Sequence, residues 1–263
     1  MSATETAICN LALLKVGHEL VDNVETGTDV DEEKCALLFD QARDELLITG
    51  PELGWKFAKR TYHSIDREEF TITALASASS TTTTVTATHT LVAGDEVTLE
   101  DTNIDGTYVV NSVSTTVSFV ITATFTATDT GTAYWTSEEY TYRYAVPTCK
   151  KVVAVKSGGL ELTDWVRWGD YILTNMESDE VDMDIIQSLT TVTLFPDYFV
   201  TVLVLKLAVV LAYNLIQDIN LAQKLEQELF LAMPKAIAMD ERQKYVQESS
   251  RSWQEVGNSQ EIE

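Results

Sequence analysis

A threonine-rich segment in the middle of the chain limits the possible folds most strongly. Residues 67–137 are roughly one-third threonine, and no lysine or arginine occurs between Arg67 and Arg143. Threonine and valine favour strands, and alternating stretches such as Val97-Thr98-Leu99 indicate strands with one buried face. A mucin-like stalk is the alternative, but the segment contains no proline and its apolar residues recur regularly. We therefore predict a small all-β domain, a barrel or a sandwich, inserted into the rest of the chain.

Two helices are expected before this segment. The first should end at Gly17, and the second should begin near Asp29 or Asp31, where acidic side chains favour the positive end of the helix dipole. Gly50-Pro51 should end the second helix. The apolar stripe of the first helix consists of Ile8, Leu11, Ala12 and Val16. That of the second consists of Cys35, Leu38, Phe39, Ala42 and Leu46.

Strands and then helices are expected after the segment. Trp165–Trp168 and Tyr171–Thr174, joined by Gly169-Asp170, have the pattern of a β-hairpin with a two-residue loop. Helices should follow from about residue 198, with Pro234 kinking or restarting the last of them. Beyond about Tyr245 the apolar pattern dissolves into a polar tail.

These patterns predict an α+β fold, a helical bundle with a small antiparallel β-sheet plus the inserted all-β domain. The expected parts are residues 1–66 (N-terminal helices of the core), 67–137 (the insert), 138–197 (the β-hairpin region of the core), 198–246 (C-terminal helices of the core) and 247–263 (an extended C-terminal tail).

An apolar run from Phe199 to Ile216 raises the alternative of a membrane span. Its length is near the lower limit for crossing a bilayer. However, Lys206 near its middle costs roughly 2.5–3.5 kcal/mol on insertion scales, and Asp197 and Asp218 flank it. A helix buried within the protein or at a subunit contact is the better interpretation, so no membrane partner is expected.

The charge of the chain argues against DNA binding. Its formal net charge is −23, and proteins gain most of their affinity for DNA by neutralising phosphates with lysine and arginine. Cys9, Cys35 and Cys149 are too far apart for a metal motif or a disulfide framework, which suits a reducing cytoplasm.

No enzyme motif is recognisable in the sequence. It contains no GxSxG, P-loop, GxGxxG or HExxH pattern, and the three histidines have no second ligand at metal spacing. We therefore predict a protein that is not an enzyme, with no catalytic residues, cofactor or metal. Forty-one carboxylates leave a glycosidase pair possible in principle, but the sequence nominates none.

Several short stretches occur in a distinctive order. They are Ala7–Leu13 (AICNLAL) with Lys15-Val16-Gly17, Cys35–Leu47 (CALLFDQARDELL) with Trp55–Ala58 (WKFA), Tyr144–Cys149 (YAVPTC), Phe195–Phe199 (FPDYF) and Ala236–Gln243. Together they resemble phage tail tubular protein A and related head-to-tail adaptor, or connector, proteins. The threonine-rich insert departs from the minimal pattern of that family, as does Thr148, where members commonly have aspartate.

The resemblance implies a structural virion protein at the head–tail junction, assembled in the cytoplasm of the host bacterium. It implies a ring of identical subunits, expected to be dodecameric, between the portal protein and the tail nozzle or tail tube. Double-stranded DNA would pass through the lumen without specific binding during genome retention and ejection. The C-terminal tail would dock on the portal, and Arg251, Trp253 and Val256 are its candidate anchors. The insert would contact tail fibres.

Two rival functions remain open at the level of sequence. The insert could bind host-surface glycans, which requires aromatic residues on exposed loops. The insert has few aromatic residues of this kind, Tyr108, Phe119 and Phe125, and their alternation is typical of core positions. A cell-wall hydrolase is the other alternative.

Overall fold

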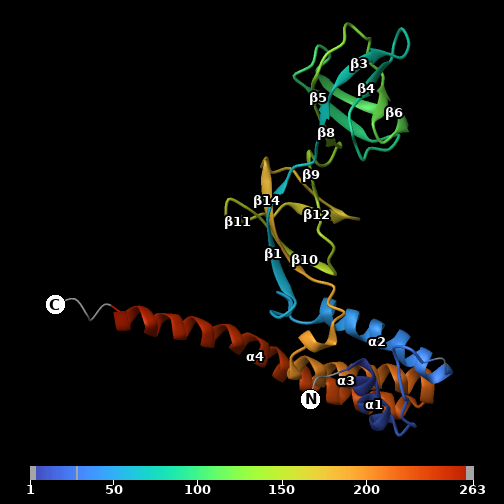
Figure 1. The fold of residues 1–263 in the computed structure, drawn as a ribbon, viewed down its shortest axis with the longest axis vertical. Helices are drawn as coiled ribbons and strands as arrows, with labels where there is room; N and C mark the ends of the chain where they lie inside the picture. The colour runs from blue at the N-terminus through green and yellow to red at the C-terminus, as the bar shows by residue number, and fades with distance from the viewer. Residues whose placement is uncertain (1–3, 28, 259–263) are drawn as a thin grey trace. The chain divides into compact units, whose positions relative to one another are not determined.

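The computed structural model describes residues 4–27 and 29–258, with side chains up to residue 242. The chain forms two compact units, each described here by itself. The helical unit comprises Met1–Arg60, Thr148–Val153 and Ile185–Glu263, and the β unit comprises Thr61–Pro147 and Ala154–Asp184. Figure 1 labels the elements of both units.

The first two of the four described helices begin and end at capping residues. The four helices are α1 (Glu5–Val16), α2 (Val30–Thr49), α3 (Asp197–Leu211) and α4 (Ile219–Asn258), with a 3₁₀ turn at Val192–Leu194 and a π turn at Ala212–Ile216. Gly17 ends α1 in the left-handed conformation, as predicted. Asp29 starts α2 with a complete capping box whose second member is Glu32, and Gly50 ends it. The cap of α1 is Thr4, whose hydroxyl accepts the amide of Ala7 at 3.1 Å.

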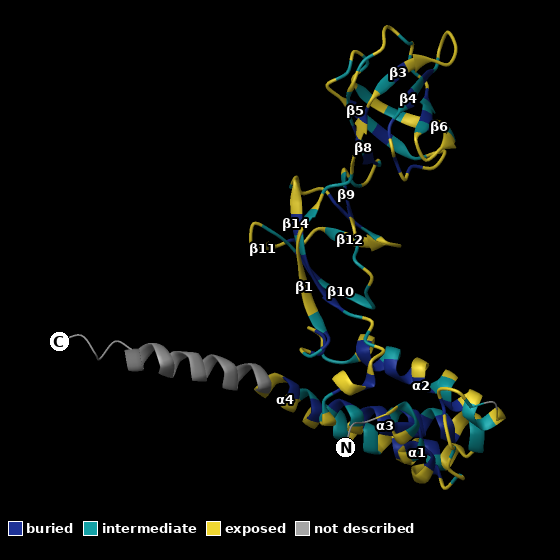
Figure 2. Cartoon of the chain, in the orientation of Figure 1, coloured by how far each residue is buried: buried dark blue, intermediate teal, exposed yellow. Residues whose placement is uncertain are grey.

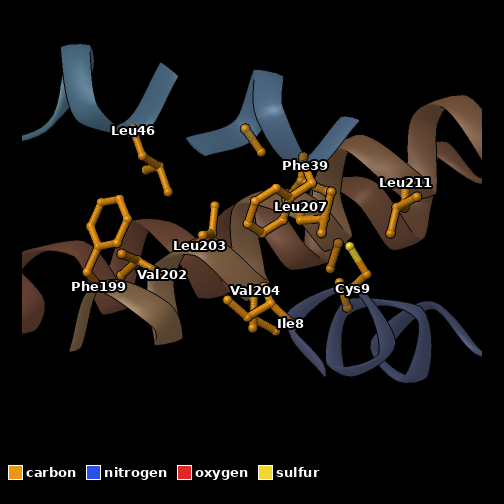
Figure 3. Packing of buried hydrophobic residues seen from close by; sticks show 14 of the residues in the cluster. Ile8, Cys9, Phe39, Leu46, Phe199, Val202, Leu203, Val204, Leu207 and Leu211 are labelled. Carbon is orange, nitrogen blue, oxygen red and sulfur yellow. The ribbon is translucent and has the colours of Figure 1, made fainter. Parts of the chain in front are cut away.

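Helix α3 is the centre of the helical core. Figure 3 shows Phe39 and Leu46 of α2 on one side of α3, and Ile8 and Cys9 of α1 on the other. All four are buried, as are most residues of α3. Lys206, the charge within this apolar helix, reaches Glu45 of α2 at 2.6 Å. Burial of its apolar residues and pairing of its one cation explain how α3 is accommodated inside the unit.

A cluster of aromatic rings closes one end of this core. Trp55 is fully buried, and its indole Nε1 donates to the Leu46 carbonyl at 2.8 Å. Its ring packs edge to face with Phe199, with centroids 5.3 Å apart. Phe57 packs on Phe199 in the same way, at 4.9 Å. Edge-to-face pairs of this kind add to the stabilisation that burial already provides.

Three sheets contain the strands. The first has the order β1 (Lys59–Asp66), β14 (Glu180–Ile186), β10 (Lys151–Ser157), β11 (Leu160–Glu161). The second has the order β12 (Trp165–Trp168), β13 (Tyr171–Thr174), β9 (Tyr142–Ala145). The third has the order β2 (Glu69–Ile72), β8 (Gly131–Thr136), β5 (Glu96–Glu100), β6 (Gly106–Thr115), β7 (Ser118–Ile121), β4 (Thr83–Thr86), β3 (Ala74–Ser77).

The seven-stranded sheet is antiparallel and nearly closed on itself. Its two outer strands, β2 and β3, are separated by Thr73 alone, so one stretch of chain pairs with β8 and then with β4. Alternating residues point inward to a second hydrophobic core that includes Val97, Leu99 and Phe119. Figure 2 shows exposed and buried positions along these strands. The threonine-rich segment thus forms antiparallel strands, as predicted, and it shares its compact unit with the strands of residues 154–184.

The predicted fold class is correct as a mixture of helix and sheet but wrong in detail. Helix (33%) and strand (31%) are nearly equal, so the protein is not a helical bundle with a small sheet. The reason lies in residues 138–197. The predicted hairpin of β12 and β13 forms with the expected register, Trp168 opposite Tyr171, but β13 pairs on its other side with β9. These strands make a sheet of their own, separate from that of β10 and β14.

Helix α4 also differs from its predicted course. It continues through Pro234 without a break, so this proline does not restart the helix. The backbone of residues 247–258, expected to be an extended tail, belongs to the same helix.

Candidate functional site: an apolar groove in the helical unit

An apolar groove of about 850 Å³ lies between α1, α3 and α4. Its lining residues are Leu11, Leu14 and Lys15 of α1, Tyr198, Val200, Thr201, Val202, Val204 and Leu205 of α3, and Glu228, Leu231, Ala232, Lys235, Ala236 and Met239 of α4. Aliphatic side chains predominate among them, so the groove offers a partner mainly apolar contact.

The rim of the groove exposes large apolar side chains to solvent. Leu14 is 60% exposed, Leu231 66% and Met239 56%. Single exposed aliphatic residues are common on protein surfaces, but a contiguous group of them marks a site of interaction. A pocket for a small molecule buries most of its ligand, whereas these residues project at the edge. The groove therefore has the character of a surface that meets another protein chain.

The sequence of α1 explains why the groove is apolar on that side. One face of α1 is buried in the core through residues such as Cys9 and Leu13. Leu11, predicted to be a core residue, is instead 49% exposed and lines the groove with Leu14. A helix that carries apolar side chains on nearly all sides is normally shielded from solvent on all of them. Within the described residues, only the inner face of α1 is buried against the core.

The charged residues of the groove differ from the balance of the whole chain. Lys15 reaches Glu228 at 3.5 Å across the α1–α4 edge, and Lys235 is exposed nearby. Two lysines and one glutamate give the lining a positive balance, although the chain carries a net charge of −23. A partner with acidic residues around an apolar centre would complement it.

Partly buried hydrogen bonds to the buried Asp240 of α4 connect this helix to α3 at the groove. The Tyr198 hydroxyl donates to Oδ1 of Asp240 at 2.6 Å. Oδ2 of Asp240 accepts the backbone amide of Lys56 at 2.8 Å. Burial, and then the neighbouring Asp240 carboxylate, raise the pKa of Tyr198 far above its usual range. The phenol therefore stays protonated and donates at any ordinary pH.

A second apolar surface lies on α2, which contributes no residue to the groove. On its outer face Leu37 is 72% exposed and Val30 59%. Because they are seven residues apart, they lie on the same side of the helix. Figure 3 shows α2 and α1 on opposite sides of α3. The helical unit thus has two separate apolar surfaces that face different ways.

Ion pairs hold the C-terminal half of α2, where Asp44 lies seven residues after Leu37 and so on the same side of the helix. The Asp44 carboxylate accepts from Lys150 Nζ at 2.5 Å and from Arg43 at 2.9 Å. Burial alone would raise the pKa of Asp44, but the hydrogen bonds and charges of Lys150 and Arg43 outweigh it, so the pKa is lowered. These contacts position α2 and so the outer face that carries Leu37.

The predicted portal anchors are not part of this site. Arg251, Trp253 and Val256 lie in the last part of α4, where side chains are outside the described residues. The groove was not predicted from the sequence. The feature that could have predicted it is the presence of Leu11 and Leu14 on α1, in addition to the apolar residues of its inner face.

The cysteines and histidines are spread over both units. Cys9 and Cys35 are buried in the helical core, as predicted, and burial raises the pKa of the Cys35 thiol to about 11. His89 is buried in the core of the seven-stranded sheet, between Phe70 and Phe119. Within the described residues, no three histidine, cysteine or acidic side chains are grouped so that they could hold a metal.

The aromatic residues of the insert face its interior. Phe119 is fully buried, and Tyr108 and Phe125 pack against the core of the seven-stranded sheet. The large apolar side chains exposed on this part of the chain are the valines Val92, Val109 and Val117. A surface for stacking sugar rings is therefore not offered by the aromatic residues that the sequence nominated.

One described helical stretch, Asp197–Ile216, is long and apolar enough to cross a membrane on length and composition alone. Just over half of it (56%) is buried inside the protein, and core helices pass the same test. Compared with known proteins, the chain matches no family model and no curated protein.

Proposed function

We propose that this protein is a structural subunit that assembles edge to edge into a closed ring, and that the ring is a head-to-tail adaptor of a tailed phage. The observation that carries the proposal is the exposed apolar groove between α1, α3 and α4, together with the separate apolar face of α2. In this account the protein works through assembly and not through catalysis.

The arrangement of the two surfaces favours a ring over a two-fold dimer. A two-fold contact uses the same patch on both subunits, whereas two different patches generate a head-to-tail series, which forms a ring when the rotation between subunits closes and a filament when it does not. The groove and the outer face of α2 are such different patches. Twelve copies are expected from the resemblance to adaptor proteins.

Four of the five stretches that resemble adaptor proteins lie in the helical unit, whereas Tyr144–Pro147 of the YAVPTC stretch belongs to the β unit. The AICNLAL stretch supplies buried residues of α1, and CALLFDQARDELL supplies those of α2. Trp55 and Phe199, from the WKFA and FPDYF stretches, belong to the same core. This supports the proposal because residues separated in sequence form one structural unit, although core residues account for a fold more directly than for a function.

The remaining parts of the proposal concern partners. The ring would lie between the portal and the tail nozzle or tail tube, with Arg251, Trp253 and Val256 as anchors on the portal. An acidic lumen would repel DNA and let it slide during ejection. The insert would be a decoration that touches tail fibres.

Electron microscopy tests the location of the ring. The full-length chain is co-expressed with the portal protein of the same phage genome, and the purified particles are imaged by negative stain. We expect a second ring stacked coaxially on each portal ring. Bare portal rings, with this chain eluting separately, would contradict the proposal.

A truncation after Val246 tests the anchors within the same experiment. It should abolish binding to the portal while the circular dichroism of the subunit stays helical. Unchanged binding would remove Arg251, Trp253 and Val256 from the account and leave the ring itself standing.

A further inference from the structure

We propose that the groove of one copy receives the outer face of α2 from the next copy, with Leu37 as the central apolar side chain. This inference rests on the proposed function, because it names the contact that would build the ring. The partner that binds in the groove is therefore a second copy of this chain.

The apolar parts of the two surfaces are matched in character. The groove offers aliphatic walls from three helices, with Leu14 and Leu231 projecting at its rim. The outer face of α2 offers Leu37, which is 72% exposed, with Val30 two turns before it and Ile48 three turns after it. Asp44 lies between Leu37 and Ile48 on this face, so Leu37 is the apolar side chain that projects from the middle of the helix. An exposed apolar side chain on a helix can anchor that helix in an apolar groove.

The charges of the two surfaces are complementary. Helix α2 contains six acidic and two basic residues. Glu33, Lys34 and Asp40 are exposed and lie one turn from Leu37. Asp40 is paired with Arg43 and Lys34 with Asp31, which leaves Glu33 as the exposed acidic side chain one turn from Leu37 that lies outside these two ion pairs. The groove has the opposite balance, with Lys15 and Lys235 against Glu228. Because the chain is acidic overall, two identical copies repel each other. A contact between the lysines of the groove and an acidic helix reduces this repulsion and is therefore favoured.

The same argument disfavours the groove of a second copy as the occupant. Two grooves facing each other would bring four lysines together, and two concave surfaces leave a void at the contact. The α2 face supplies a convex ridge instead, and it lies on the other side of α3 from α1 (Figure 3).

Site-directed cross-linking tests the pairing. Cys149 is replaced by serine, while Cys9 and Cys35 are fully buried and stay. A tagged chain with Leu14→Cys and an untagged chain with Leu37→Cys are co-expressed, assembled with the portal protein and oxidised. We expect one cross-linked heterodimer on a denaturing gel, and at least a tenfold weaker product when either chain is present alone. Leu160→Cys in the β unit, at a residue that is 77% exposed, replaces Leu37→Cys in the control and should give no such product.

The possible outcomes separate this inference from the proposed function. Dimers formed by Leu14→Cys alone would mean that groove meets groove and would overturn the inference. Assembled rings without any cross-link would overturn the occupant and leave the ring proposal intact. A small apolar molecule retained by the unassembled chain, shielding Leu14→Cys from maleimide, would overturn it as well. Failure of the unsubstituted chain to assemble at all would overturn the proposed function itself.

Discussion

The helical unit and the seven-stranded sheet of the β unit differ in how completely they bury their apolar residues. The sheet nearly closes on itself, turns its large apolar side chains inward and presents threonine outward. The helical unit buries a core of similar character but leaves Leu14, Leu37, Leu231 and Phe230 exposed. Closing a sheet leaves few free edges for a partner. This difference supports the proposal that the helices carry the assembly surface.

The two hydrophobic cores should unfold independently of each other. Phe199→Ala in the helical unit and Phe119→Ala in the seven-stranded sheet each remove a fully buried ring, which costs about 3–5 kcal/mol of unfolding free energy. Guanidinium unfolding followed by tryptophan fluorescence and by far-ultraviolet circular dichroism should show that each variant shifts a different transition. A single transition, shifted equally by both, would break the distinction between the cores.

Within the β unit, Arg143 should matter nearly as much as a core residue. Its buried guanidinium pairs with Glu68, donates to Thr90 at 3.0 Å and stacks on Tyr171. Arg143→Met leaves Glu68 unpaired, so we expect a loss of about 3–5 kcal/mol in unfolding free energy. The double variant Arg143→Met, Glu68→Gln should lose less than Arg143→Met alone. An equal or larger loss would mean that the ion pair is not what stabilises this region.

The hydrogen bond between Tyr198 and Asp240 should have a smaller effect on the helical unit. Tyr198→Phe removes one partly buried hydrogen bond and should lower the unfolding free energy by about 1 kcal/mol. Tyr213→Phe is the matched control, because its hydroxyl bonds to Glu226 at 3.2 Å on an exposed surface. The control should change stability by less than about 0.5 kcal/mol. Equal effects would show that the network at the groove does not hold α4 in place.

The pH dependence of the Asp44 contacts should be smaller still. Because the folded protein lowers the pKa of Asp44, its ionised form adds stability above the unfolded pKa of about 4. That stability is lost as the pH falls through the folded value. The difference in unfolding free energy between the wild type and Asp44→Asn should therefore shrink below about pH 4. A difference that stays constant down to pH 3 would contradict this.

Removal of the insert should have the smallest effect of all on assembly. Glu69 of β2 lies opposite Tyr134 of β8, so the two ends of the insert are neighbours and a short linker can replace Thr71–Thr136. We expect the shortened chain to assemble with the portal as the full chain does. Loss of helical structure in the shortened chain would show that the insert is part of the core.

Local rules predicted many elements of this fold from the sequence. Gly17, Asp29 and Gly50 mark helix ends because caps act within a few residues. The hairpin at Gly169-Asp170 is equally local. Pairing between strands that are distant in sequence is not determined locally. For this reason the sequence did not predict that β9 and β10 belong to separate sheets. The groove was missed for a related reason, since the sequence of α1 shows two apolar faces but not which of them the rest of the chain covers.

Native mass spectrometry of the full-length chain, alone and with the portal protein, tests the central claim most directly. If the exposed groove and the α2 face join successive copies, the spectrum should contain a closed assembly of a fixed number of chains, expected to be twelve. Leu14→Asp, which places a charge in the groove, should abolish that species while leaving a folded monomer. A wild-type chain that stays monomeric in both samples would contradict the account.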